Sequence, residues 1–244
     1  MTEGSAGEEP RFYRRWVGCR DLTGFTVKHG ETDMFVLADR DLGRETAEIT
    51  ARLRREIEEY IETSERFAVS LSPVSPDPGA PAIIRDMIEK SAMAGVGPMA
   101  GVAGAMAGYT AKELLNQSCE VIIENGGDIF MVSRKTRNLA VYAGASPLSG
   151  KISLRIRPES TPLGICTSSG TVGHSISFGS ADAACAISED AVLADCAATG
   201  MGNLVKDPSS LKDAINYARS IDGLRGALVI FRDKLATWGD VELI

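Results

Sequence analysis

A stretch of 21 residues without a charged side chain, SAMAGVGPMAGVAGAMAGYTA at residues 91–111, most constrains how this chain can fold. Its length would be enough to cross a lipid bilayer as a helix. The stretch contains five glycines and Pro98, however, and it contains no leucine, isoleucine or phenylalanine. Because its apolar content is too low for a lipid environment, the sequence predicts a buried glycine-rich loop that leads into a helix.

The same stretch contains the pattern Gly-x-Gly-x-x-Ala, which begins at Gly95. In a dinucleotide-binding loop this pattern follows a strand and begins a helix. Here it follows a predicted helix at residues 81–92, so it fails that test. We expect Gly101, Gly104 and Gly108 to allow close packing between helices instead.

Charge and cysteine content narrow the class of protein. The net charge of −7 and the lack of a long basic run argue against nucleic acid as a partner. The five cysteines are odd in number and none has Cys-x-x-Cys spacing, which favours neither a disulfide framework nor a zinc site. A reducing, cytoplasmic location is therefore expected. Residues 1–10 are acidic and polar, which predicts a disordered tail and no signal peptide.

Hydrophobic periodicity predicts clusters of strands separated by long helices. This order favours an α+β fold over a regular βαβ alternation. We expect residues 11–244 to form one domain. The predicted helices cover residues 42–63, 81–92, 104–117 and 209–220, with another from about residue 188; the predicted strands cover residues 15–19, 25–30, 34–39, 119–124, 129–134, 139–145, 151–157 and 163–168, followed by a hairpin over residues 226–240 that turns at Arg232 and Asp233.

The segment ENGGDIF places Gly126 and Gly127 between two predicted strands, with Asp128 directly after them. Glycine permits a positive φ angle and a close approach of a ligand to the main chain. Asn-Gly is also a strong hairpin signal by itself. Both interpretations, a tight hairpin and a ligand-binding turn, stay open from these residues alone.

The segment GICTSSGTVGHS ends a predicted strand with three hydroxyl residues, Thr167, Ser168 and Ser169, followed by Gly170. Hydroxyls and free backbone N–H groups at a strand end can bind an anion or a polar ring. His174 lies close by in the sequence and is either structural or catalytic. Cys166, which directly precedes Thr167, is expected to pack in the core, and a reactive thiol is the alternative.

The segment LADCAATG places Asp195 and Thr199 four residues apart in a predicted helix, so both side chains lie on one face. A carboxylate and a hydroxyl suit a hard cation such as Mg²⁺, which prefers oxygen ligands and often bridges to phosphate. A helix cap or a buried hydrogen bond is the alternative explanation.

Taken in order, these segments resemble the ApbE-like superfamily, whose best-known members are magnesium-dependent FAD:protein FMN transferases. GAMAGYTAKEL looks like that family's glycine-alanine-lysine-glycine helix start, IENGGDIF like its Gly-Gly-Asp motif, CTSSG like its Thr-Ser-Gly element, and LADCAATG like its Ala-Asp-x-x-Ala-Thr metal motif. The match covers about residues 104–203. The resemblance implies an α+β fold of duplicated T-fold-type units, in which antiparallel sheets are packed by helices.

The resemblance also implies roles for individual residues. Asp195 and Thr199 would bind Mg²⁺, and His174 would lie near the diphosphate or the reacting group as a catalytic residue. Since T-fold relatives often assemble through their sheets, it also implies a homodimer as one assembly. The pocket for a flavin, FAD or FMN, would be lined by Gly126, Gly127, Asp128, Thr167, Ser168, Ser169 and Gly170.

Two features depart from the family pattern. Ala107 stands where the family has its lysine, and no Asp-Pro-x-Thr-Gly segment precedes the metal motif. The whole chain is also similar to a short branch of the superfamily, found in anaerobes, which has been associated with sulfur assimilation and homocysteine formation. The sequence therefore supports two functions: magnesium-dependent binding of a flavin or other phosphorylated ligand, with FMN transfer, or a non-catalytic accessory role in anaerobic sulfur assimilation.

Overall fold

A computed structural model describes residue 19, residues 21–171 and residues 178–244 of the chain. An eight-stranded sheet runs through this part of the chain, in the order β1-β2-β3-β4-β7-β8-β9-β10, and every neighbouring pair is antiparallel. Two shorter strands form a separate antiparallel pair. The large sheet consists of β1 (Thr23–His29), β2 (Thr32–Ala38), β3 (Val121–Asn125), β4 (Asp128–Val132), β7 (Leu163–Ser168), β8 (Ala183–Ser188), β9 (Leu224–Phe231) and β10 (Lys234–Gly239); the pair consists of β5 (Arg137–Ala140) and β6 (Ser153–Ile156).

The helices lie between the hairpins of the large sheet in the chain order. Four follow the first hairpin and two follow the third, among the described residues. They are α1 (Gly43–Thr63), α2 (Glu65–Val69), α3 (Ala82–Ala94), α4 (Val102–Leu114), α5 (Ala191–Leu204) and α6 (Leu211–Arg219), with short 3-10 turns η2 (Pro98–Gly101), η3 (Pro158–Ser160) and η4 (Pro208–Ser210).

The topology is that of a duplicated unit. In the first half, hairpin β1–β2, helices α1 to α4 and hairpin β3–β4 follow one another, and β3 pairs directly with β2. In the second half, hairpin β7–β8, helices α5 and α6 and hairpin β9–β10 repeat this order, and β9 pairs with β8. The halves join where β4 pairs with β7. The predicted fold of duplicated antiparallel units with packed helices is therefore confirmed.

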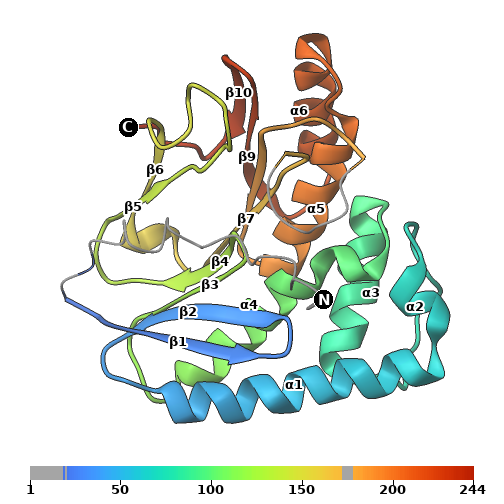
Figure 1. Ribbon diagram of the computed structural model, residues 1–244, viewed down its shortest axis with the longest axis vertical. Coiled ribbons are helices and arrows are strands. Elements are labelled where there is room, and N and C mark those ends of the chain that lie inside the picture. Colours follow the sequence, from blue (N-terminus) through green and yellow to red (C-terminus); the bar gives the residue numbers. More distant parts are fainter. Residues whose placement is uncertain (1–18, 20, 172–177) are drawn as a thin grey trace, which may run out of the picture.

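The sheet separates two hydrophobic cores. Alternate side chains of each strand face the helices, among them Ile123, Phe130 and Cys166. The intervening side chains, such as Ile165 and Ile187, face the pair β5–β6 and the segment that joins those two strands. Figure 1 shows this arrangement, with β5 and β6 on one side of the sheet and α3, α5 and α6 on the other.

The charge-free stretch forms the end of α3, the turn η2 and most of α4, as a buried loop and helix. Gly95 ends α3 with a positive φ of 68°, a conformation that glycine adopts without strain. In the described residues no helix is both long and apolar enough to span a membrane.

Several boundaries differ from the sequence prediction. The predicted strand at residues 15–19 lies almost wholly outside the described residues. The first hairpin is tighter than expected, since His29 pairs with Thr32 and only Gly30 and Glu31 remain in the turn. The predicted strand at residues 139–145 ends at Ala140, because the following segment reverses direction through Gly144 and Gly150, both at positive φ.

Candidate functional site

The Gly-Gly turn between β3 and β4 is a two-residue hairpin turn. Gly126 and Gly127 have φ angles of 71° and 106°, and Asn125 pairs with Asp128 across the turn. Two successive positive φ angles are typical of the primed hairpin turns, which favour glycine. The Gly127 N–H donates to the Glu124 carboxylate at 2.9 Å. The hairpin interpretation is confirmed, and the turn leaves two main-chain units without side chains to cover them.

The polar residues that flank this turn continue two apolar rows. Val121 and Ile123 face the helices from β3, and Asn125 is the next residue with this orientation. Phe130 faces the helices from β4, and Asp128 is two residues before it. The helix-covered core therefore ends in an amide and a carboxylate, both buried.

Asp128 contacts the end of β7. Its carboxylate Oδ1 accepts a hydrogen bond from the main-chain N–H of Thr167 at 3.2 Å. A methyl group placed on Gly127 would lie 3.7 Å from the Thr167 carbonyl oxygen, so the turn itself also touches β7. The Gly-Gly-Asp turn and the hydroxyl-rich strand end are therefore neighbours in the fold.

Asp195 lies in α5, which begins after Asp190. The Asp190 side chain caps this helix by accepting from the N–H groups of Val192 and Leu193 at 2.9 and 3.2 Å. Asp195 is 7% exposed, and its Oδ2 accepts from the main-chain N–H of Gly104 at 2.8 Å. Asp195 thus links α5 to the start of α4.

Glycines allow α4 to lie this close to α5. A methyl group on Gly104 would lie 2.3 Å from the Ala191 carbonyl oxygen, and one on Gly101 would lie 2.7 Å from the Cys196 sulfur. One on Gly108 would be 3.5 Å from the Ala191 side chain, an ordinary contact. The predicted role in close helix packing is confirmed at Gly101 and Gly104, whereas the space around Gly108 would admit a methyl group.

The buried carboxylate of Asp128 perturbs the buried carboxylate of Asp195. Burial raises the pKa of Asp128 to about 7. Burial and then repulsion from Asp128 raise the pKa of Asp195 well above its usual range, although N–H groups of Gly104 and Ala103 partly oppose the shift. No lysine or arginine of the described residues forms an ion pair with either carboxylate. This pair of buried acids therefore lacks a compensating positive charge within the described part of the protein.

The hydroxyl residues at the end of β7 do not all face the same way. Ser168 faces α5, where a methyl group on Gly202 would lie 3.3 Å from its oxygen. The Thr167 hydroxyl instead contacts Cys185 in the core on the other face of the sheet. Only the main chain of Thr167 reaches Asp128. Ser169 is half-buried and accepts the N–H of Thr171 at 3.1 Å.

The remaining site predictions have simple outcomes. Gly170 is exposed, and its N–H donates to the Ala181 carbonyl at 2.9 Å. Thr199 is half-buried, one helical turn after Asp195. His174 lies outside the described residues. Cys166 is fully buried, and burial raises the pKa of its thiol, so the core-packing interpretation is confirmed.

The side chains of Asp128, Asp195 and Thr199 decide whether this cluster can bind Mg²⁺. The described residues contain no ready cluster of three His, Cys, Asp or Glu side chains that could hold a metal ion. Magnesium does not need one, because it is often bound by one or two carboxylates together with waters and substrate phosphates. Asp195, Asp128 and Thr199 offer only oxygen ligands, and the charged form of the two acids, which burial disfavours, has no compensating cation among the described residues. The set fits a hard divalent cation better than it fits zinc.

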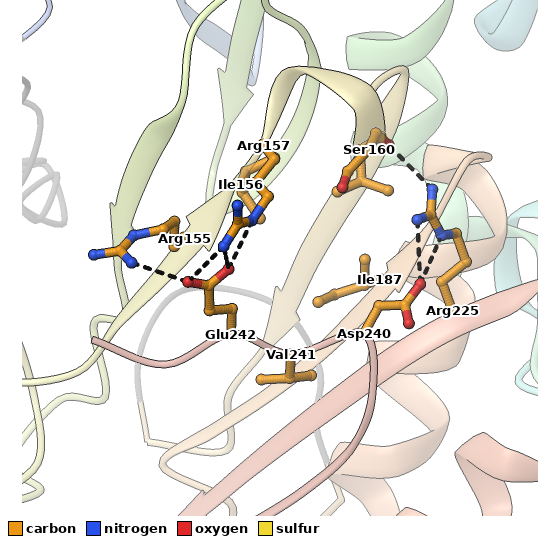
Figure 2. A pocket seen from close by; sticks show the side chains of 10 residues that line it. Arg155, Ile156, Arg157, Ser160, Ile187, Arg225, Asp240, Val241 and Glu242 are labelled. Atoms are coloured by element: carbon orange, nitrogen blue, oxygen red, sulfur yellow. Dashed lines mark hydrogen bonds and ion pairs between the residues drawn. The ribbon is translucent and has the colours of Figure 1, made fainter.

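Two surface pockets of the described chain lie away from this cluster. One, of about 330 Å³, is lined by the first residue of β7 and the last part of β8, at the opposite end of those strands from Ser168. Figure 2 shows that Arg155 and Arg157 point to Glu242 there, while Arg225 points to Asp240. The other pocket, of about 490 Å³, lies beside the start of α5. Neither is lined by a predicted site residue.

One residue of the cluster was missed by the sequence prediction. Asn125 is 6% exposed and donates from its amide to the Ala103 carbonyl at 3.2 Å. In the sequence, Asn125 serves only as part of the Asn-Gly hairpin signal. The alternation of Val121 and Ile123 would have placed it on the helix-covered face.

Comparison with known proteins shows the family of this chain. The family model described as "AbpE bacteria" matches residues 14–224. A UPF0280 protein of Methanocella arvoryzae is 40% identical over 215 residues, which cover 88% of this chain and 87% of the relative. A UPF0280 protein of Methanospirillum hungatei is 42% identical over 219 residues, 88% of this chain and 86% of the relative.

Solved structures share the fold. The apo flavinyl transferase ApbE of Pseudomonas stutzeri aligns with a TM-score of 0.55 at 11% identity, over 89% of this chain and 94% of that one. The flavin transferase ApbE of Vibrio cholerae aligns with a TM-score of 0.56 at 10% identity, over 89% and 96% of the two chains. The chain belongs to the AbpE bacteria family, an ApbE-like branch that includes the UPF0280 proteins.

Proposed function

We propose that this chain binds FAD through its diphosphate together with Mg²⁺, and that it transfers FMN to an acceptor. The observation that supports this most directly is the pair Asp128 and Asp195. Burying two carboxylates without a compensating positive charge is costly, and a divalent cation between or beside them would remove much of that cost. The likeness of the fold to solved flavin transferases supports a flavin as the class of ligand.

Each residue of the cluster has a proposed task. Asp195 and Thr199 would hold Mg²⁺, and Asp128 would add negative charge beside it. When bound, Mg²⁺ supplies charge neutralisation on the phosphate oxygens. Gly126 and Gly127 would let the ligand approach the main chain, since no side chain covers it.

The proposed reaction is a phosphoryl transfer. The bond between the two phosphates of FAD breaks, and the phosphorus of FMN forms an ester with a hydroxyl of the acceptor. AMP departs with the bridging oxygen, and the proton of the acceptor hydroxyl passes to a base. His174 is proposed as that base or as a residue near the diphosphate.

Titration of the purified chain with FAD, in the presence and absence of Mg²⁺, tests the binding step. FAD should bind more tightly with Mg²⁺, and Asp195→Ala should abolish that difference. Asp222→Asn is a matched control, because Asp222 is an exposed acid outside the cluster. FAD binding that ignores both Mg²⁺ and the loss of Asp195 would reject the proposal.

A second function, binding without transfer, is supported by position 107. Ala107 is fully buried in α4, so no charged side chain reaches the cluster from the place where the resemblance expects a lysine. A binding protein of this kind could serve as an accessory in anaerobic sulfur assimilation. It would bind FAD with Mg²⁺ yet attach no flavin to acceptor proteins of a cell extract. A deletion strain should then need homocysteine or methionine under sulfide-limited growth.

A further inference from the structure

One peptide group in the molecule is held at both ends by side chains from distant parts of the chain. The group joins Ala103 to Gly104. Its carbonyl oxygen accepts from the Asn125 amide at 3.2 Å, and its N–H donates to the Asp195 carboxylate at 2.8 Å. An amide, a main-chain peptide and a carboxylate therefore form a continuous line of hydrogen bonds.

The local structure explains why Asn125 can take part. It is the last residue of β3 and lies opposite Asp128, so the hairpin turn fixes its position. It is 6% exposed, and its amide nitrogen faces the beginning of α4. The absence of a side chain on Gly104 then lets this peptide group approach α5 closely enough to reach Asp195.

We propose that Asn125 is a positioning residue for Asp195. Its amide sets the plane of the Ala103–Gly104 peptide, the peptide N–H sets the rotation of the Asp195 carboxylate, and that orientation presents the carboxylate to Mg²⁺. Hydrogen bonds in series also polarise one another, which strengthens the one that Asp195 accepts. This inference rests on the proposed binding of Mg²⁺ at Asp195.

The inference predicts a loss of metal affinity without a loss of any metal ligand. Residues that orient a metal ligand typically contribute about 10- to 100-fold to affinity. Asn125→Ala should therefore weaken the Kd for Mg²⁺ by about 10- to 100-fold. Asn138→Ala is the matched control, because Asn138 is exposed on β5 and should leave the Kd unchanged.

Isothermal titration calorimetry with MgCl₂ on the full chain measures this without any substrate. Asn125→Leu serves as a second variant, since it fills nearly the same space but cannot donate a hydrogen bond. A merely structural role would lower the unfolding temperature of both variants and leave their Kd values equal to that of the parent. Such equal values would overturn the inference while the proposed function stands. Failure of the parent itself to bind Mg²⁺, both alone and in the presence of FAD, would overturn both.

Discussion

Asp128, in the first half of the duplicated fold, raises the pKa of Asp195, in the second half, by repulsion that adds to the effect of burial. The two acids come from hairpin β3–β4 and helix α5, and the pairing of β4 with β7 and the contact of α4 with α5 help to bring them together. This relationship has measurable consequences for stability and for metal binding.

Replacement of Asp128 by asparagine should make the metal-free protein more stable at pH 8. A carboxyl whose folded pKa is about 7 and whose unfolded pKa is about 3.9 binds more protons in the folded state, so stability falls as the pH rises between those values. Asparagine removes this cost, on the order of 2–4 kcal/mol at pH 8, and still accepts the Thr167 N–H.

Thermal unfolding in EDTA at pH 5, 6, 7 and 8 measures this effect. The advantage of Asp128→Asn should grow over that range and become small near pH 4. An equal destabilisation of the variant at every pH would mean that Asp128 serves only as an acceptor for the Thr167 N–H and that its pKa is not raised.

Two glycines of α4 should respond in opposite ways to alanine. Gly104→Ala places a methyl group 2.3 Å from the Ala191 carbonyl, which forces α4 away from α5 and should cost about 1–3 kcal/mol or more. Gly108→Ala meets only ordinary contacts and gains helix propensity, so it should be neutral or stabilising by up to about 1 kcal/mol. Urea unfolding of both variants decides the matter, and similar losses at the two positions would contradict the packing described here.

Among the arginines of the described residues, Arg137 is expected to contribute most to stability. It is 8% exposed, bonds Asp21 through two nitrogens at 2.9 and 3.0 Å, and also bonds the buried Glu120 at 3.1 Å. Arg137→Met leaves Glu120 buried without this partner, a change that typically costs about 3–5 kcal/mol. Arg155→Met removes a more exposed pair with Glu242 and should cost no more than about 1 kcal/mol. Equal unfolding midpoints for the two variants would show that the Glu120 side chain finds other partners.

Thr199 should contribute to Mg²⁺ binding through its hydroxyl rather than its shape. Thr199→Val keeps the shape and should weaken the Mg²⁺-induced rise in unfolding temperature, whereas Thr199→Ser should retain most of it. Thr237, exposed on β10, provides the control when it is changed to valine. Identical Mg²⁺ responses in Thr199→Val and the parent would remove Thr199 from the ligand set.

Local patterns were enough to predict much of the fold. Helix α1 begins at Gly43 and ends at Thr63, within one residue of the prediction, because its apolar residues repeat with helical spacing. The last hairpin turns at Arg232 and Asp233 as expected, since Phe231 pairs with Lys234. Such elements are determined by residues close together in the sequence, so local patterns are enough to predict them.

Other features depend on distant segments and could not be predicted in this way. The short strand β6 is completed by the end of the chain, where Leu154 pairs with Leu243. Thr167 and Ser168 point to opposite faces because side chains alternate along a strand, but which of the two hydroxyls faces the helices depends on how β7 is placed in the sheet. The spacing of Asp195 and Thr199 indicated a shared helical face, but the hydrogen bond from Gly104 depends on how closely two helices approach.

The seam between β4 and β7 gives this architecture one further property. Asp128, which is proposed to add negative charge beside the cation, and the Gly104 N–H, which orients Asp195, precede the seam in the chain, and Asp195 follows it. A partly folded molecule with only one half ordered would lack part of the proposed cation site. Binding of the ion would therefore stabilise the state in which both halves of the sheet are folded. Loss of the ion should weaken the contact between the halves before either half unfolds.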